Sequence, residues 1–121
     1  MRVQTDPEVR LLADEDHHLV MRMIRDERRA QMRKWGEQNH PDGTSSGMAG
    51  LIADQWKRVC DTKHRNDEDN WATIAAEEFF ECMAETDEDK LLEEVVQNAA
   101  VFAAWAEDIV RRRRLRKAQG D

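Results

Sequence analysis

The sequence predicts an all-α fold, and three observations support this prediction. Hydrophobic residues make up 40% of the 121-residue chain and charged residues 37%, a balance typical of a folded helical protein with solvated outer faces. β-Branched residues are sparse, whereas Ala, Glu, Arg, Leu and Met, which favour helices, are plentiful. Apolar residues recur at helical spacing over long segments, and no segment indicates a sheet. We therefore expect a single domain over residues 1–121, folded as a four-helix bundle.

The first helix is expected from Pro7 to about Lys34. Asp6 can cap its first turn, and proline is favoured at the first helical position. Gly36 is expected to end it, since glycine is a common helix terminator. The apolar residues with helical spacing in this segment are Val9, Leu12, Leu19, Val20, Met23, Ile24 and Ala30.

Three further helices are expected after a polar loop at residues 37–47, which is rich in Gly, Ser, Asn and Pro. The second helix runs from about Met48 to Arg65, and the third from about Asn70 to Ala84. The fourth begins at residues 86–89 and extends nearly to the C-terminus. The residues of the second helix expected to face inward are Leu51, Ile52, Trp56 and Val59.

Charge and cysteine content exclude several classes of protein. The formal net charge of −7 argues against a general nucleic-acid binder, and an acidic protein that handles phosphates needs a metal or local cations. Cys60 and Cys82 form neither a disulfide framework nor a zinc pattern, so we interpret both as reduced helix residues.

No run of about 18 apolar residues predicts a membrane span, and the first residues lack the apolar core of a signal peptide. A cytoplasmic location is therefore expected. The basic segment 111–121 is interpreted as a solvated helix end, where cations are favoured, with a nucleic-acid patch as the alternative.

Acidic residues in the expected third helix form the most informative motif. Glu78 and Glu81 lie three positions apart, so they share a helix face, and Glu77 shares a face with Glu81. The flanking residues are apolar, and buried acids are costly unless they are paired or bound to a cation. Carboxylate oxygens are the ligands that magnesium prefers, so the motif predicts a magnesium site.

The fourth helix repeats this arrangement with Glu94 and Gln97, which again lie three positions apart among apolar residues. Two consecutive antiparallel helices can turn these side chains toward Glu78 and Glu81. The alternative is a solvated face, because glutamate is common on helix surfaces. The coincidence of two such pairs on adjacent helices favours a metal site.

These residues resemble the signature of the MazG-like all-α nucleoside triphosphate pyrophosphohydrolases, Glu-Glu-x-x-Glu followed after a gap by Glu-x-x-Asp. The first element is complete as Glu77, Glu78 and Glu81. The segment 34–41, Lys-Trp-Gly-Glu-Gln-Asn-His-Pro, and Trp71 before the acidic motif also resemble MazG-like proteins of phages and actinobacteria. The resemblance covers about residues 25–110. Gln97 departs from it, because the family pattern has an acid there.

The resemblance implies magnesium-dependent hydrolysis of a nucleoside triphosphate to the monophosphate and pyrophosphate. It implies Glu78, Glu81, Glu94 and Gln97 as metal ligands and Glu77 as a ligand or catalytic base. An amide at Gln97 brings no negative charge, which places catalytic competence in question. Proteins of the family are commonly dimers or tetramers, so a homo-oligomer is expected.

Six residues are candidates for binding the substrate: Trp35, Trp71, His40, Lys63, Arg65 and Asn98. Aromatic faces stack on nucleobases, although both tryptophans can instead pack in the core. Lysine and arginine can bind phosphates, but cations at the end of the second helix also offset its dipole. The histidine lies in the loop and can equally have no role, and the asparagine is four residues beyond Glu94.

Two other functions remain open from the sequence. The first is a non-catalytic helical module whose weakened site binds a nucleotide or nothing, which the glutamine at position 97 favours. The second is a small nucleic-acid-associated protein that uses the arginine-rich end, which the overall acidity opposes.

Overall fold

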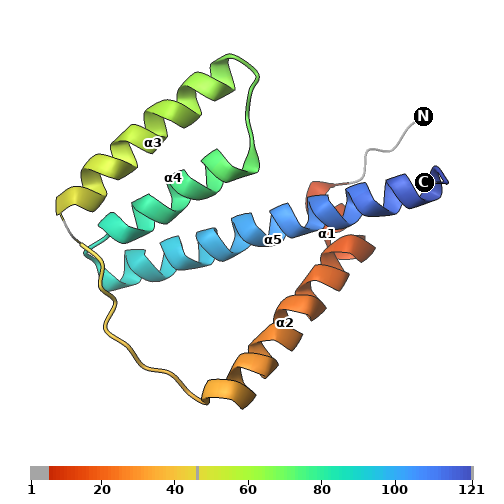
Figure 1. Ribbon diagram of the computed structural model, residues 1–121, viewed down its shortest axis with the longest axis horizontal. Coiled ribbons are helices and arrows are strands. Elements are labelled where there is room, and N and C mark those ends of the chain that lie inside the picture. The colour runs from red at the N-terminus through yellow and green to blue at the C-terminus, as the bar shows by residue number, and fades with distance from the viewer. Residues whose placement is uncertain (1–5, 46, 121) are drawn as a thin grey trace. The chain divides into compact units, whose positions relative to one another are not determined.

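The computed structural model describes residues 6–45 and 47–120, which form five α-helices and no strand (Figure 1). The expectation that the chain lacks a signal peptide concerns mainly residues 1–5, which lie outside the described part, as do Ser46 and the final residue, Asp121. The helices are α1 (Pro7–Ala13), α2 (Glu15–Trp35), α3 (Gly47–Arg65), α4 (Trp71–Ala84) and α5 (Glu88–Ala118). The all-α prediction is confirmed.

The prediction of one helix from Pro7 to about Lys34 is wrong, because the segment is divided at Asp14. The backbone of Asp14 is extended, with φ −76° and ψ 118°. Its side chain accepts hydrogen bonds from the backbone N–H groups of Asp16 and His17, at 2.8 and 3.2 Å. These bonds satisfy donors at the start of α2, so the aspartate caps a new helix and ends the previous one.

The other helix boundaries follow the sequence prediction. Gly36 ends α2 with a positive φ of 68°, a conformation that glycine adopts without steric cost. Asn70 caps α4 by accepting a hydrogen bond from the N–H of Thr73 at 2.8 Å. The carboxylate of Asp87 accepts from the N–H of Lys90 at 3.0 Å and so caps the first turn of α5.

The chain divides into two compact units. The first contains α1, α2 and the part of α5 from Ala103 onward. An ion pair between Arg114 and Asp16, at 2.9 Å, and a contact between the His17 ring and the Glu107 carboxylate, at 3.3 Å, join helices within it. The partners are about ninety or more positions apart in the sequence, so these contacts are long-range.

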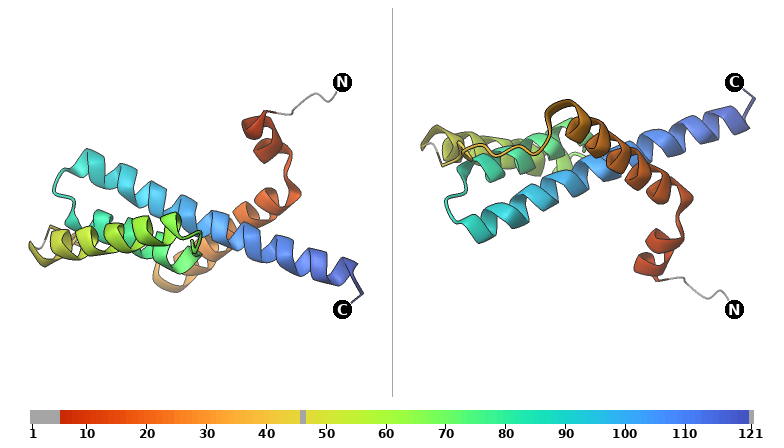
Figure 2. Two further views of the ribbon diagram at one scale, coloured as in Figure 1. Left: turned by 90° about the horizontal axis from the view of Figure 1, so that it is seen from above. Right: turned by 90° about the horizontal axis from the view of Figure 1, so that it is seen from below.

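The second unit covers residues 40–102 and contains α3, α4 and the first part of α5. Helices α3 and α4 lie side by side along their lengths (Figure 2). Their contact includes the rings of Trp56 and Phe80, stacked with centroids 6.4 Å apart. Buried alanines, Ala53 and Ala75 among them, let the helices approach closely.

Large apolar side chains remain exposed in the second unit. Leu51 and Val59 were predicted to face inward, but the structure leaves them 62% and 38% exposed. The physical reason is that α3 turns its small residues, Ala49 and Ala53, inward, which places Leu51 on another face. The exposed apolar residues of α5 in this unit are Leu92, Val95, Val96 and Phe102.

None of the five described helices combines the length and the apolar character that crossing a membrane requires.

Candidate metal centre

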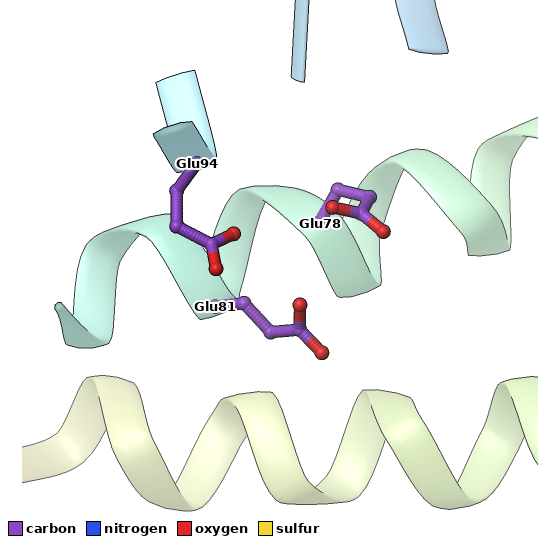
Figure 3. A group of neighbouring side chains, drawn as sticks. All are labelled: Glu78, Glu81 and Glu94. Carbon is purple, nitrogen blue, oxygen red and sulfur yellow. The ribbon is translucent and has the colours of Figure 1, made fainter. Parts of the chain in front are cut away.

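Three glutamates from two helices of the second unit meet at one point (Figure 3). Glu78 and Glu81 lie one turn apart on α4, and Glu94 comes from α5. One carboxylate oxygen of each lies within 4.8 Å of the others. Magnesium binds oxygen at about 2.0–2.1 Å, so opposite ligands lie about 4.2 Å apart. The cluster is therefore slightly wider than a magnesium coordination sphere, and small side-chain rotations would close the difference.

Some carboxylate oxygens of the cluster are buried without a hydrogen-bond partner in the described part of the chain. All three glutamates are half-buried. The Oε2 atoms of Glu78 and Glu94 are buried and have no hydrogen-bond partner within the described part of the chain. Buried polar atoms are nearly always paired, because an unpaired one loses its hydration without replacement. A cation between these carboxylates would supply the missing partner, so the residues present fit a magnesium ion.

The pKa shifts of the cluster glutamates also indicate that a cation would stabilise the cluster. Burial raises the pKa of Glu78 above its ordinary value of 4.5, and the charges of Glu94 and Glu77 raise it further. The pKa of Glu81 is also raised, first by burial and then by neighbouring glutamates, while Lys57 opposes the shift. The carboxyl groups of Glu78 and Glu81 are thus harder to ionise than free ones, and a bound cation would offset that penalty.

Asn98 was predicted as a substrate-binding residue, and the structure places it between the two helices of the cluster. Its Nδ2 donates to the backbone carbonyl of Glu78 on α4, at 3.0 Å, and to that of Glu94 on α5, at 2.8 Å. The side chain is half-buried. It therefore connects the backbones of two cluster residues.

Glu77 lies beside the cluster and is not one of its three converging residues. It is near Cys60 of α3, whose thiol pKa is raised to about 12 by burial and by the hydrogen bond and charge of Glu77. The thiol also donates to the backbone carbonyl of Thr73, at 3.3 Å. Cys60 therefore stays protonated at neutral pH, and both Cys60 and Cys82 are free thiols, in agreement with the sequence interpretation. The role of Glu77 as a base stays a prediction.

Gln97, the predicted fourth ligand, is exposed on α5, whereas Glu94, one turn earlier, is half-buried. The described cluster consequently consists of three carboxylates, and coordination by the amide of Gln97 stays a prediction.

The tryptophans and the histidine predicted to bind substrate have different surroundings. Trp71 is the half-buried first residue of α4, about two turns before Glu78 on the same helix. Trp35 belongs to the first unit, is 57% exposed, and has the Nζ of Lys34 4.8 Å from its ring centroid. His40 is exposed in the loop before α3. The stacking roles of the tryptophans are therefore still predictions.

The predicted phosphate-binding cations lie at the C-terminal end of α3. Lys63 is one of the residues that line a cavity of about 350 Å³ there, and no cluster glutamate lines that cavity. Arg65 is exposed and donates to the hydroxyl of Thr62, at 3.2 Å. The structure therefore does not bring Lys63 into the glutamate cluster.

From the sequence, Lys57 is only one of several cations near the end of the second helix that can bind phosphates or offset the helix dipole, but the structure makes it the exposed α3 residue whose charge acts on Glu81. No motif marks this lysine. Its relevance follows only from the packing of α3 against α4, which brings a residue 24 positions away in sequence close to the cluster.

No protein-family model, curated protein or solved structure matches this chain. The resemblance to MazG-like proteins consequently stays a prediction from the motif residues and their spacing.

Proposed function

We propose that this chain is a magnesium-dependent nucleoside triphosphate pyrophosphohydrolase with a MazG-like helical bundle. One observation carries the proposal. Glu78, Glu81 and Glu94 converge within 4.8 Å, and two of them have buried oxygens without a hydrogen-bond partner. Such a set of hard, uncompensated oxygen donors suits magnesium, which usually works in phosphate chemistry with a few carboxylates, waters and the substrate's own phosphates.

The three carboxylates would hold magnesium, which when bound supplies charge neutralisation for the phosphates. Glu77 stands next to Glu78 and is the candidate to accept a proton from an attacking water. Trp71, on the same helix as Glu78 and Glu81, is the candidate to stack on the base, and His40 is a candidate to contact the substrate. Attack at the α-phosphorus would release the nucleoside monophosphate and pyrophosphate.

A second function is a non-catalytic helical module that binds a nucleotide through a degenerate metal site. The observation that favours it is the exposure of Gln97, where the MazG-like pattern has an acid. With three carboxylates the site carries less charge than with four, so it would bind metal more weakly.

Pyrophosphate release from canonical and modified nucleoside triphosphates, with and without magnesium, tests the enzymatic proposal. We expect magnesium-dependent release that Glu78→Gln and Glu81→Gln abolish, because each removes a charged ligand. Glu93→Gln is the matched control, since Glu93 is an exposed glutamate next to Glu94. No release from any triphosphate at high protein concentration would reject the enzymatic function, and release that survives both substitutions would reject the site.

We further propose that the protein is a cytoplasmic homo-oligomer. Leu92, Val95 and Phe102 recur at three- and seven-residue spacing on α5 and are 66%, 49% and 52% exposed. Contiguous exposed apolar surface is typical of association sites, and in soluble oligomers the partner is most often a second copy. Sedimentation analysis of the wild type and of Val95→Glu tests this: an oligomer that the charge dissociates is expected, and a monomeric wild type would reject it.

A further inference from the structure

The amide of Asn98 holds the backbones of the two glutamates whose carboxylates lack partners. Its two N–H groups match its two acceptors, the carbonyl of Glu78 on α4 and that of Glu94 on α5. The Oε2 atoms of the same two residues are buried without hydrogen-bond partners. Both N–H groups of the Asn98 amide therefore donate to backbone carbonyls of cluster residues.

The two hydrogen bonds of Asn98 oppose the repulsion between the carboxylates of Glu78 and Glu94. Carboxylate oxygens of Glu78 and Glu94 lie within 4.8 Å of each other, so the two negative charges repel each other when no cation is bound. Repulsion across the helix pair would move α4 and α5 apart and separate the metal-binding oxygens. The bond from Asn98 to the Glu78 carbonyl, 20 positions away in sequence, acts across this same helix pair.

Magnesium is sensitive to such a displacement, because it demands near-ideal octahedral geometry. The candidate ligand oxygens lie within 4.8 Å of one another, already slightly more than the about 4.2 Å between opposite oxygens around magnesium. Holding ligands in place before the ion arrives reduces the cost of binding.

We propose that Asn98 is a positioning residue that keeps Glu78 and Glu94 close enough to share one magnesium ion. The inference rests on the metal site of the proposed function. It replaces the predicted substrate contact of Asn98 with a role inside the protein. Asparagine suits this role because its amide offers two donors on a short side chain, whereas a carboxylate at this position would face two carbonyl acceptors without a proton to donate.

Metal titrations of three variants test the proposal. Asn98→Leu keeps the branched shape of the side chain but has no donor, and Asn98→Ala removes the amide altogether. Asn98→Ser is the mildest change: a helical serine bonds the carbonyl four residues earlier, so it can keep the bond to Glu94 and lose the bond to Glu78. Binding is measured with MnCl₂, from the EPR signal of the free ion, and with MgCl₂ by calorimetry.

All three variants are expected to lower the affinity for both ions by about tenfold or more, as loss of a residue supporting metal ligands typically does. Trp56→Leu is the structural control. It removes the stacking on Phe80 between α3 and α4, so it should lower the melting temperature without changing the metal affinity of the folded protein.

Wild-type affinity in folded Asn98→Ser and Asn98→Leu would overturn the inference. So would an equal loss of affinity in Trp56→Leu, since Asn98 would then act only through general stability. A wild-type protein that binds neither ion would overturn it as well, because no site would exist to position. The enzymatic proposal fails differently: the ions bind, the Asn98 variants bind them weakly, and no triphosphate releases pyrophosphate.

Discussion

Two regions of this molecule contain acidic side chains removed from water. In one region these side chains have basic partners, and in the other some of their oxygens have none among the described residues. In the first unit, Asp16 and Glu107 are each only 8% exposed, and each has a basic partner, Arg114 at 2.9 Å and His17 at 3.3 Å. In the second unit, Glu78 and Glu94 have buried oxygens without hydrogen-bond partners among the described residues.

The difference indicates where the compensating charge comes from. Removing a carboxylate from water is unfavourable unless a cation or several donors replace the lost hydration. The first unit supplies the partners, the guanidinium of Arg114 and the imidazole of His17, from its own sequence. Among the described residues, the one cation whose charge lowers the pKa of a cluster glutamate is Lys57, which is exposed and is the smallest of the influences on Glu81. An external cation is therefore the natural partner of the cluster, and three predictions test this contrast.

The largest effect is expected from Glu78→Gln. It should weaken magnesium binding by about 100-fold or more, beyond the loss typical of supporting residues, because a charged ligand is removed. In EDTA at pH 7 the same change should raise the melting temperature, because one of the mutually repelling charges is gone.

Thermal unfolding with and without magnesium measures both effects, since an ion that binds only the folded protein raises its melting temperature. Glu93→Gln is the control and should leave the magnesium response unchanged. A lower melting temperature of Glu78→Gln in EDTA would contradict the idea that the cluster is destabilising without metal.

The second prediction is that removing a buried charge from the first unit lowers the melting temperature, the opposite of the effect expected for Glu78→Gln. Asp16→Asn should lower the melting temperature, by about 4 °C or more, because it removes the charge that holds the guanidinium of Arg114. Asp26→Asn on the same helix breaks only an exposed pair with Arg29 and should change little.

Magnesium should not change the fall in melting temperature that Asp16→Asn causes, since Asp16 is already paired with the guanidinium of Arg114. Equal small effects of Asp16→Asn and Asp26→Asn would show that burial of the Asp16 pair is not important for stability.

The third and smallest effect is on pH dependence without metal. Burial and neighbouring charges raise the pKa of Glu78 and Glu81 in the folded protein above the ordinary value of 4.5. The folded state therefore holds more protons than the unfolded state at these two sites. Their contribution to stability is fully present below pH 4.5 and is lost as the pH rises through the folded pKa values.

Urea unfolding in EDTA from pH 4 upward measures this contribution as the difference between wild type and Glu78→Gln. The wild type should lose stability relative to the variant as pH rises. A difference that is constant with pH would contradict the raised pKa of Glu78.

Part of the site could be predicted from the sequence because helical geometry is local. The spacing of Glu78 and Glu81 places them on one face of any α-helix, and Asn70 and Gly36 mark helix ends by their own side-chain and backbone chemistry. The break at Asp14 was also readable, since an aspartate followed by two acids is a helix start. The helical spacing of apolar residues continues on both sides of Asp14, which led to the prediction of one uninterrupted helix.

Contacts between helices could not be read in the same way. The sequence suggested that Glu94 could face Glu78 and Glu81, but only the packing of α4 and α5 brings their oxygens together and buries two of them. The same packing directs the amide of Asn98 to the carbonyls of Glu78 and Glu94.

The sequence by itself determined the helical class, most helix ends and one face of the acidic motif, because these depend on residues within one or two turns. The tertiary structure decided which carboxylates remain without a partner. Asp16 meets Arg114 across 98 positions, while within the described part of the chain the Oε2 atoms of Glu78 and Glu94 have no hydrogen-bond partner. Whether a buried acid is compensated depends on what packs against it, and that is a property of the folded chain.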